Sequence, residues 1–300
     1  MKASVLINNY NYGRFLGQAI DSALSQTHAP TEVVVVDDGS GDNSRDIIAG
    51  YGNRVRAVLK QNGGQASAFN AGFAACTGDV VCLLDADDYF NPNKVASVVD
   101  AMTADPAAGW VFHPVCREFT DGRTLIAPRI ANRMLIDNRD HALRGKLSGP
   151  PGPVTSGMSL SRTLLGGILP MPEEIRITAD NYLKVLASAL SPGVYLSEAL
   201  AVQRLHGGNL YTTGRDRILE ARIHLLIADA MRRRQPSLRR LSNHVFARSF
   251  GMYAAAFRRD ERCETLIKSF FRGTALSDMP DLVLRALYHS VRRRLASQPL

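Results

Sequence analysis

The sequence contains no run of 18 or more uncharged apolar residues, so no segment is expected to cross a bilayer as a helix. Its first residues, MKASVLINNY, lack the charged start and the long apolar core of a secretion signal. The four cysteines form no CxxC pair and no zinc-ligand spacing, which argues against metal and redox sites and favours reduced packing residues. We therefore expect a globular, cytoplasmic protein.

Net charge is also absent from most of the chain, because the overall +8 is concentrated near one end. Residues 1–214 hold 18 Lys and Arg against 20 Asp and Glu, a net charge of −2. Residues 215–300 hold 18 against 8, a net charge of +10. A nearly neutral amino-terminal two thirds argues against a nucleic-acid-binding core, so no nucleic acid partner is expected.

The first hundred residues alternate between apolar runs and amphipathic stretches. Four runs rich in Val and Ile predict strands that are buried on both faces, as in a parallel sheet covered by helices: SVLIN (4–8), EVVVVDD (32–38), VRAVLK (55–60) and DVVCLLD (79–85). Helical periodicity predicts the intervening helices at 14–26, 45–51, 65–76 and 91–102, the last with Pro92 in its first turn. Strand–helix alternation predicts a doubly wound α/β fold.

The rhythm changes after residue 105. The stretch 110–126 predicts two strands around the turn Asp121–Gly122. Helices are expected near 161–168 and 179–190, a strand near 194–205, and only helices from residue 215 onward. We therefore predict a domain over 1–214, divided at 105/106, and a basic helical extension over 215–300.

Polar side chains follow three of the predicted strands. After the first strand come Asn8, Asn9 and Tyr10. After the second come Asp37, Asp38, Gly39 and Ser40, and after the fourth come Asp85, Asp87 and Asp88. In open α/β sheets ligands bind beyond the carboxyl ends of the strands, so these groups should meet at one edge. Crowded carboxylates suit Mg²⁺ or Mn²⁺ bound together with substrate phosphates. The alternative is that each Asp simply caps a turn or a helix.

Three segments resemble family-2 glycosyltransferases of the GT-A fold. They are SVLINNYNYGRFLGQAIDSALSQTHAPTEVVVVDDGSGDNS (4–44), KQNGGQASAFNAGFAACTGDVVCLLDADDYFNP (60–92, which contains a DxD motif) and VQRLHGGNL (202–210). The likeness covers roughly residues 3–210. It implies a Rossmann-like, mostly parallel sheet flanked by helices, with a helical carboxy-terminal extension. It also implies an enzyme that uses a nucleotide-diphospho-sugar, with UDP as the expected nucleotide.

The resemblance also implies roles for individual residues. Asn8 and Tyr10 would line the nucleobase and ribose pocket, and Asp38 would accept a hydrogen bond from the base. Three further residues would border the sugar–nucleotide pocket: Asn62, Gly63 and Gln65. Asp87 would ligate the divalent cation, Mn²⁺ or Mg²⁺, between the two phosphates. Asp85 would touch the ribose or the metal, and His206 would be a further contact to the metal or the diphosphate.

An inverting transfer needs a base opposite the leaving group, so the base should come from a later segment than the metal site. Asp180 stands where the family has its second acid, in Ala179–Asp180 at the start of a predicted helix. A helix-start acid that merely favours the helix dipole is the alternative. Ser156 and Met158 would lie near the acceptor. The QxxRW motif of processive synthases is missing, which favours the addition of single sugars. The resemblance further implies a role in cell-envelope or polysaccharide synthesis.

The basic extension combines apolar stripes with Arg clusters, as in MRRRQPSLRR (231–240) and LVLRALYHSVRRRLASQ (282–298). Basic amphipathic helices can lie on an anionic membrane, which suggests peripheral contact with the inner face of the cell membrane and a glycan or lipid-linked acceptor. A solvated face or a protein-docking surface is the alternative.

Two other functions compete with a transferase. DADDY (85–89) superficially matches the nucleophile motif of haloacid-dehalogenase-type phosphohydrolases, although that family has it after the first strand and this chain after the fourth. A non-catalytic nucleotide-sugar-binding module is the second alternative. A dinucleotide-binding Rossmann enzyme is not expected, because no GxGxxG follows the first strand.

Overall fold

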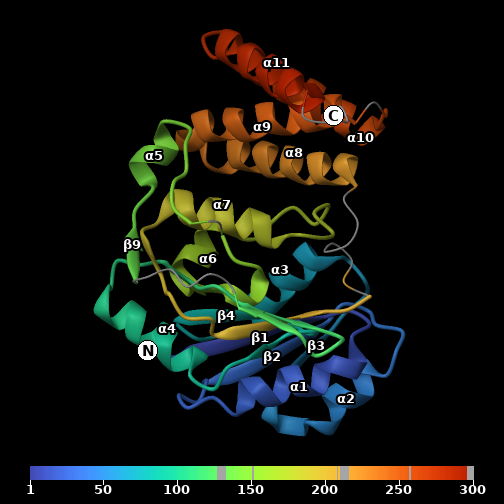
Figure 1. The fold of residues 1–300 in the computed structure, drawn as a ribbon, viewed down its shortest axis with the longest axis vertical. Coiled ribbons are helices and arrows are strands. Elements are labelled where there is room, and N and C mark those ends of the chain that lie inside the picture. Colours follow the sequence, from blue (N-terminus) through green and yellow to red (C-terminus); the bar gives the residue numbers. More distant parts are fainter. Residues whose placement is uncertain (127–132, 151, 208, 210–215, 257, 296–300) are drawn as a thin grey trace. The chain divides into compact units, whose positions relative to one another are not determined.

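The computed structural model describes residues 1–126, 133–150, 152–207, 209, 216–256 and 258–295 (Figure 1). The chain divides into two compact units, Met1–Asn138 with Gly149–Asn209, and Arg139–Ser148 with Leu210–Leu300. The expected boundary at 214/215 lies outside the described residues. The segment 139–148, predicted to lie in the first domain, belongs to the second unit.

The first half of the larger unit follows the predicted alternation. Its four parallel strands are β1 (Ala3–Asn9), β2 (Glu32–Asp37), β3 (Arg56–Leu59) and β4 (Val80–Asp85), in the order β3-β2-β1-β4. Its helices are α1 (Gly13–Leu24), α2 (Ser44–Gly50), α3 (Gln65–Ala75) and α4 (Lys94–Ala104). The α/β fold class is confirmed, but Pro92 lies two residues before α4 and not in its first turn, because the helix begins only after Asn93.

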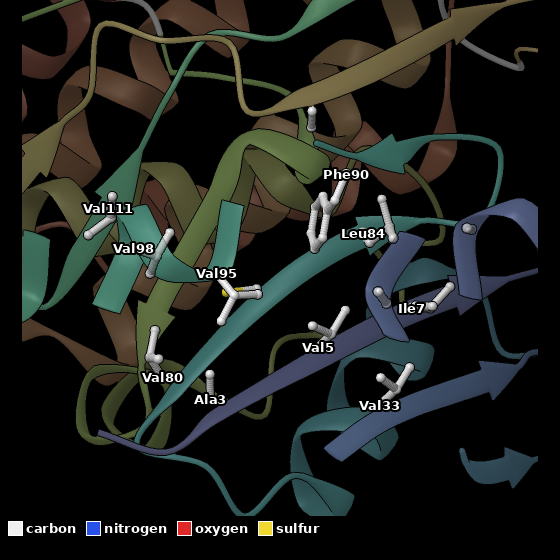
Figure 2. Packing of buried hydrophobic residues seen from close by; sticks show 14 of the residues in the cluster. Ala3, Val5, Ile7, Val33, Val80, Leu84, Phe90, Val95, Val98 and Val111 are labelled. Atoms are coloured by element: carbon white, nitrogen blue, oxygen red, sulfur yellow. The ribbon is translucent and has the colours of Figure 1, made fainter. Parts of the chain in front are cut away.

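The core lies between the sheet and its helices. Val5 and Ile7 of β1 are fully buried in one apolar cluster with residues of α1 and α4 (Figure 2). Side chains alternate along a strand, so Leu6 and Asn8 point to the opposite face, where α3 packs against β1 and β2. This second face carries the polar row described below.

The sheet continues beyond β4 with shorter strands. Its order is β3-β2-β1-β4-β10-β6-β11-β9, where the added strands are β10 (Met158–Ser161), β6 (Trp110–Phe112), β11 (Gly193–Tyr195) and β9 (Met134–Ile136). Strand β10 runs antiparallel to both β4 and β6. The remaining short elements of this unit are η1 (Gly52–Arg54), which precedes β3, and η2 (Thr155–Gly157), which precedes β10. Its remaining helices are α6 (Arg162–Ile168) and α7 (Asp180–Leu190), whereas α5 (Arg139–Leu143) belongs to the other unit.

A second sheet has the order β5-β12-β7-β8, with strands β5 (Tyr89–Phe90), β12 (Ala201–Leu205), β7 (Cys116–Phe119) and β8 (Thr124–Ile126). The predicted hairpin around Asp121–Gly122 is confirmed as β7–β8. The single strand predicted over 194–205 is wrong, since β11 and β12 belong to different sheets. Pairing of β12 with β5 attaches residues 201–202 to the strand that follows the Asp85–Asp88 loop.

Every regular element that the structure describes in the smaller unit is a helix, as predicted for residues 215–300. Besides α5, its elements are α8 (Arg217–Arg234), η3 (Pro236–Leu238), α9 (Arg239–Ala254), α10 (Glu261–Arg272) and α11 (Met279–Leu295). Phe246 of α9 stacks on Phe270 of α10 with ring centroids 3.9 Å apart, and both rings are buried. Among the described residues no helix combines the length and the apolar composition needed to cross a bilayer.

Candidate active site

Three polar side chains line the carboxyl ends of β2, β1 and β4 on the face covered by α3. Asn8 is paired in register with Asp85 of β4, and Asp38 directly follows β2. These residues come from segments far apart in the sequence, so only the parallel sheet brings them together. The predicted convergence at one edge is what the geometry shows.

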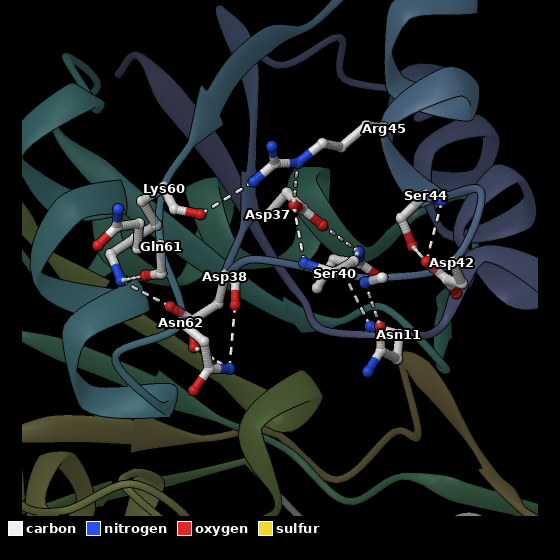
Figure 3. Close-up of polar contacts among 12 residues, drawn as sticks. Asn11, Asp37, Asp38, Ser40, Asp42, Ser44, Arg45, Lys60, Gln61 and Asn62 are labelled. Atoms are coloured by element: carbon white, nitrogen blue, oxygen red, sulfur yellow. Dashed lines mark hydrogen bonds and ion pairs between the residues drawn. The ribbon is translucent and has the colours of Figure 1, made fainter.

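Asp38 is buried and its carboxylate accepts several hydrogen bonds (Figure 3). Lys60 Nζ lies 2.6 Å from Oδ1, and the backbone N–H groups of Gly63 and Gly64 donate over 2.9 and 2.7 Å. The amide of Asn62 donates to both the backbone carbonyl and the carboxylate of Asp38. Asn62 and Gly63, predicted at the pocket border, therefore contact the predicted base-binding acid directly.

The neighbouring Asp37 has a structural role. It accepts hydrogen bonds from Asn9 (2.9 Å), Arg45 (2.8 Å) and the backbone of Ser40 (3.1 Å) (Figure 3). Burial alone would raise the pKa of Asp37, but these hydrogen bonds outweigh it and hold the pKa below its usual value. Asp37 thus fixes the β2 loop, in agreement with the turn interpretation for this one residue.

Asp85 lies half-buried at the end of β4. Burial, the charge of Asp87 and the charge of Asp180 raise its pKa to about 8, although the side chains of Thr155 and Gln65 donate hydrogen bonds to it. The oxygen of the Gln65 amide accepts the backbone N–H of Ala179 over 2.9 Å. Gln65 therefore connects Asp85 with the start of α7.

Asp87 is buried beside the loop that follows β12. Its Oδ2 lies 3.2 Å from His206 Nε2 and accepts a hydrogen bond of 3.0 Å from the Asn209 amide. Burial raises the pKa of the Asp87 carboxyl despite the nearby His206 and Arg204. Two of the three predicted metal ligands are thus in direct contact.

Asp88 links the Asp85–Asp88 loop to η2 and β12. It accepts hydrogen bonds from the Ser156 hydroxyl (2.6 Å) and the Arg204 backbone (3.1 Å). Burial, followed by the charges of Asp87 and Asp85, raises the pKa of Asp88 well above its usual value. Ser156 and Met158 are both completely buried. Their expected place near the acceptor stays a prediction.

The tautomer of His206 follows from its other neighbour. Arg14 Nη2 lies 3.2 Å from His206 Nδ1, and a guanidinium can only donate, so Nδ1 carries the lone pair. In a neutral ring the hydrogen then sits on Nε2 and is donated to Asp87. His206 could bind a metal through Nε2 only after this pattern is exchanged.

The carboxylates fit a divalent cation that arrives with a phosphate-bearing ligand. Asp85 and Asp87 each raise the other's free energy of ionisation, which a cation between them would relieve. Mg²⁺ commonly takes only one or two protein carboxylates and completes its shell with substrate phosphates. Accordingly, no group of three or more His, Cys, Asp or Glu side chains within the described residues is arranged to hold an ion unaided.

Asn8 and Tyr10 differ in what they offer a ligand. Tyr10 is 43% exposed at the rim, where its ring is free to stack. Asn8 is only 9% exposed, and both polar atoms of its amide are buried with no protein hydrogen-bond partner. Asn8 therefore lies beneath the predicted base and ribose pocket in this conformation.

Asp180 is the first residue of α7 and forms an ion pair with Lys184, with Oδ2 2.8 Å from Nζ. Thr178, two residues earlier, has a φ of +48°, a rare conformation for a β-branched residue. Strain of this kind is concentrated at functional sites, and here it turns the chain so that Ala179 reaches Gln65.

Sequence patterns missed several basic and aromatic members of the site. Arg204 donates from its guanidinium to the backbone carbonyl of Asp87 over 3.1 Å. Tyr12 lies near all three acids of the loop, and burial followed by their charges raises the pKa of its phenol. Lys60 and Arg14 complete the set. The one available signal was that each stands within a few residues of a predicted site residue.

Comparison with known proteins identifies the family. The family model described as glycosyl transferase family 2 matches residues 4–165, more than half of the chain. An uncharacterized glycosyltransferase of Nostoc sp. is 38% identical over 216 residues, 70% of this chain and 66% of that protein. The hyaluronan synthase of Pasteurella multocida is 38% identical over 112 residues, 36% of this chain and 12% of that enzyme. The chain thus spans less than two thirds of the length of the curated relatives it matches.

Solved structures agree on the fold. The structure of S. aureus TarS 1-349 in complex with UDP-GlcNAc has a TM-score of 0.64 and 18% sequence identity, covering 99% of this chain and 91% of that chain. At this identity the likeness concerns the fold alone. The haloacid-dehalogenase alternative is wrong, since the family match includes the Asp85–Asp88 loop in its position after the fourth strand. The chain belongs to glycosyl transferase family 2 and has its GT-A type of α/β fold.

Proposed function

We propose that this protein transfers a sugar from a nucleoside-diphosphate donor, UDP-linked, to a hydroxyl group of a glycan or lipid-linked acceptor in cell-envelope or polysaccharide synthesis. The observation that carries the proposal is the meeting of Asp38, Asp85, Asp87 and Asp180 at one edge of the sheet. Support comes from the relatives, which include a chondroitin synthase and a hyaluronan synthase, and from TarS, which binds UDP-GlcNAc.

The donor would bind along the row from Asp38 to Asp87. Asp38 keeps its carboxylate fixed by Lys60 and the Gly63–Gly64 backbone, so it is ready to accept a hydrogen bond from the base. Tyr10 would stack on that base from the exposed rim.

Mn²⁺ or Mg²⁺ would be held by Asp87, with Asp85 and His206 as further contacts. When bound, the ion would stabilise the negative charge that develops on the leaving diphosphate. Arg14 and Arg204 place two permanent positive charges next to the same position. The carboxylates must lose their protons before they can bind the ion.

Asp180 would act as the general base. The acceptor hydroxyl attacks C1 of the sugar, its proton passes to the Asp180 carboxylate, and the bond from C1 to the diphosphate oxygen breaks with inversion. Lys184 keeps the carboxylate oriented, and the link from Ala179 through Gln65 to Asp85 keeps it in register with the donor site. Addition of single sugars, without processive movement, is part of the proposal.

Asp180→Asn tests this mechanism. Release of UDP from UDP-GlcNAc with Mn²⁺ and an acceptor should fall by about 10²–10⁴-fold, while the thermal shift caused by UDP and Mn²⁺ is retained. Asp46→Asn, an acid in the first turn of α2, is the matched control and should keep its turnover.

Unchanged turnover in the Asp180 variant would remove this residue from the mechanism. A wild-type chain that binds UDP and Mn²⁺ but transfers no sugar to any acceptor would instead favour the non-catalytic binding module.

A further inference from the structure

Helix α11 leaves a broad apolar surface uncovered. Its buried residues, Leu282, Ala286 and Ser290, recur every four positions and face α9, against which α11 packs. The close approach of the two helices requires glycine at one point, because a Cβ on Gly251 would lie 2.7 Å from the backbone carbonyl carbon of His289. This contact fixes which side of α11 is turned outward within the helical unit.

The outward side is apolar where a solvated helix would be polar. Leu284 is 68% exposed, Leu287 55%, Tyr288 59% and Val291 56%, at spacings of three, one and three residues. With ~3.6 residues per turn, these positions form a single stripe on the helix surface. Leu276, 89% exposed, lies just before the helix. Exposed apolar surface of this extent marks an interaction site.

Positive charge borders the stripe on one flank. Arg285 and Arg292 of α11 are exposed on the side next to the apolar residues. Arg285, together with Arg248 of α9 and Lys146, lies close enough to His244 to lower its pKa, after burial as the main cause. Asp281, which pairs with Arg285 over 2.7 Å, is the one acid in the first turn of α11.

We propose that α11 binds the surface of an anionic lipid bilayer, with the stripe Leu284–Leu287–Tyr288–Val291 inserted among the lipids and Arg248, Arg285 and Arg292 against the headgroups. A basic border beside an apolar face matches such a surface on both counts. A second copy of this chain on the same stripe would bring two sets of these cations together, which costs free energy. The inference concerns the helical unit and does not depend on the proposed glycosyl transfer.

The test is co-sedimentation of the full chain with vesicles, which needs no activity. Vesicles of phosphatidylglycerol and phosphatidylcholine should retain the protein at about 0.1 M salt, and retention should fall at about 1 M, where the Debye length shrinks to ~3 Å. The triple variant Leu284→Ser, Leu287→Ser, Val291→Ser should bind at least about tenfold more weakly. These side chains are exposed, so the variant should keep its fold, as circular dichroism can show.

Leu125→Ser is the matched control, since Leu125 is 54% exposed on β8 of the other unit, and it should bind like the wild type. The double variant Arg248→Gln, Arg292→Gln should lose most of the difference between anionic and purely phosphatidylcholine vesicles. The proposal is overturned if the wild type fails to bind anionic vesicles at low salt. It is equally overturned if sedimentation velocity shows a dimer that the triple variant abolishes, which would assign the stripe to a second copy.

Discussion

At the scale of the residue, Asp85 sets a pH dependence. Its pKa of about 8 lies well above the value of about 3.9 for an unfolded aspartate. Between these values the folded chain holds a proton that the unfolded chain has lost, so stability falls as pH rises through this window. We expect the melting temperature of the metal-free protein to decrease from about pH 5 to pH 8 through this group.

Asp85→Asn should flatten that decrease, measured as melting temperature against pH in the presence of a chelator. Asp46→Asn, at an exposed position of α2, should leave the slope unchanged. Mn²⁺ with UDP should stabilise the wild type most at high pH, where the ligand no longer competes with protons. A slope that is identical in wild type and Asp85→Asn would contradict the assignment.

Arg14 controls the tautomer of His206 and hence the availability of Nε2. Arg14→Ala removes the donor to Nδ1 and a nearby positive charge, so Mn²⁺ alone should bind more tightly, by about 10-fold, the lower end of the usual second-shell effects. Titration followed by the electron paramagnetic resonance of free Mn²⁺ measures this. His206→Ala in the same background should remove the gain; if it does not, His206 is no metal ligand.

Three acids of the candidate site, Asp38, Asp85 and Asp87, could be predicted from the sequence because they lie at or just after the end of a strand with a clear apolar signature. To predict that Asp38 and Asp87 lie at the same edge of the sheet, it was enough to know that parallel strands have their carboxyl ends at one edge. Arg204 could not be predicted in the same way, since its contact with Asp87 joins positions 117 residues apart in the sequence. Burial of the Asn8 amide was also invisible, because it depends on what covers the strand end.

At the scale of the element, Gly64, directly before α3, packs closely against the segment that precedes α7. Its φ is +88°, and a Cβ there would lie 2.7 Å from the Cα of Arg176. Gly64→Ala should therefore push residues 175–180 away and displace Asp180 from the donor site. We expect turnover to fall by about tenfold or more, because small displacements of catalytic groups are costly.

Gly166→Ala in α6 is the control for this variant, because no atom lies within 4 Å of a Cβ at that position. It should leave turnover unchanged and slightly raise helix stability. Equal turnover in Gly64→Ala and wild type would show that the α3–α7 contact does not position the base.

Short strands explain most of the differences from the expected elements. Strand β10 contains only Met158–Ser161 and lacks a run of β-branched residues, so its sequence gives no strand signal, yet it is held on both sides by β4 and β6. Likewise Leu196–Leu200 separates two strands that read as one apolar stretch. Tertiary pairing, which is not local, decided both cases.

At the scale of the whole molecule, the two units have separate cores. Phe246→Ala would leave a cavity against Phe270 in the helical unit and should lower the free energy of unfolding by about 3–5 kcal/mol. Denaturant titration measures this. Because the residues of the proposed donor site all belong to the larger unit, the UDP-induced stabilisation of that unit should persist. Its loss would show that the helical unit supports donor binding.

The charge distribution was read correctly from the sequence because charge needs only counting. The exposed side of α11 could not be predicted from the sequence, since Leu282 and Leu284 are equally apolar. Only the packing of α11 against α9 buries the first and leaves the second exposed.

The pairing of β5 with β12 has a mechanical consequence. Tyr89 pairs with Val202 and Phe90 with Ala201 in an antiparallel arrangement. Asp87, just before β5, and His206, just after β12, are therefore held side by side although they are 119 positions apart. Because the strand pairing holds both residues, we expect Asp87 and His206, the proposed metal contacts, to keep their spacing when a donor binds. Adjustment to a larger donor sugar would then come from the start of α7, so that Asp180, the proposed base, moves while the proposed diphosphate site stays in place.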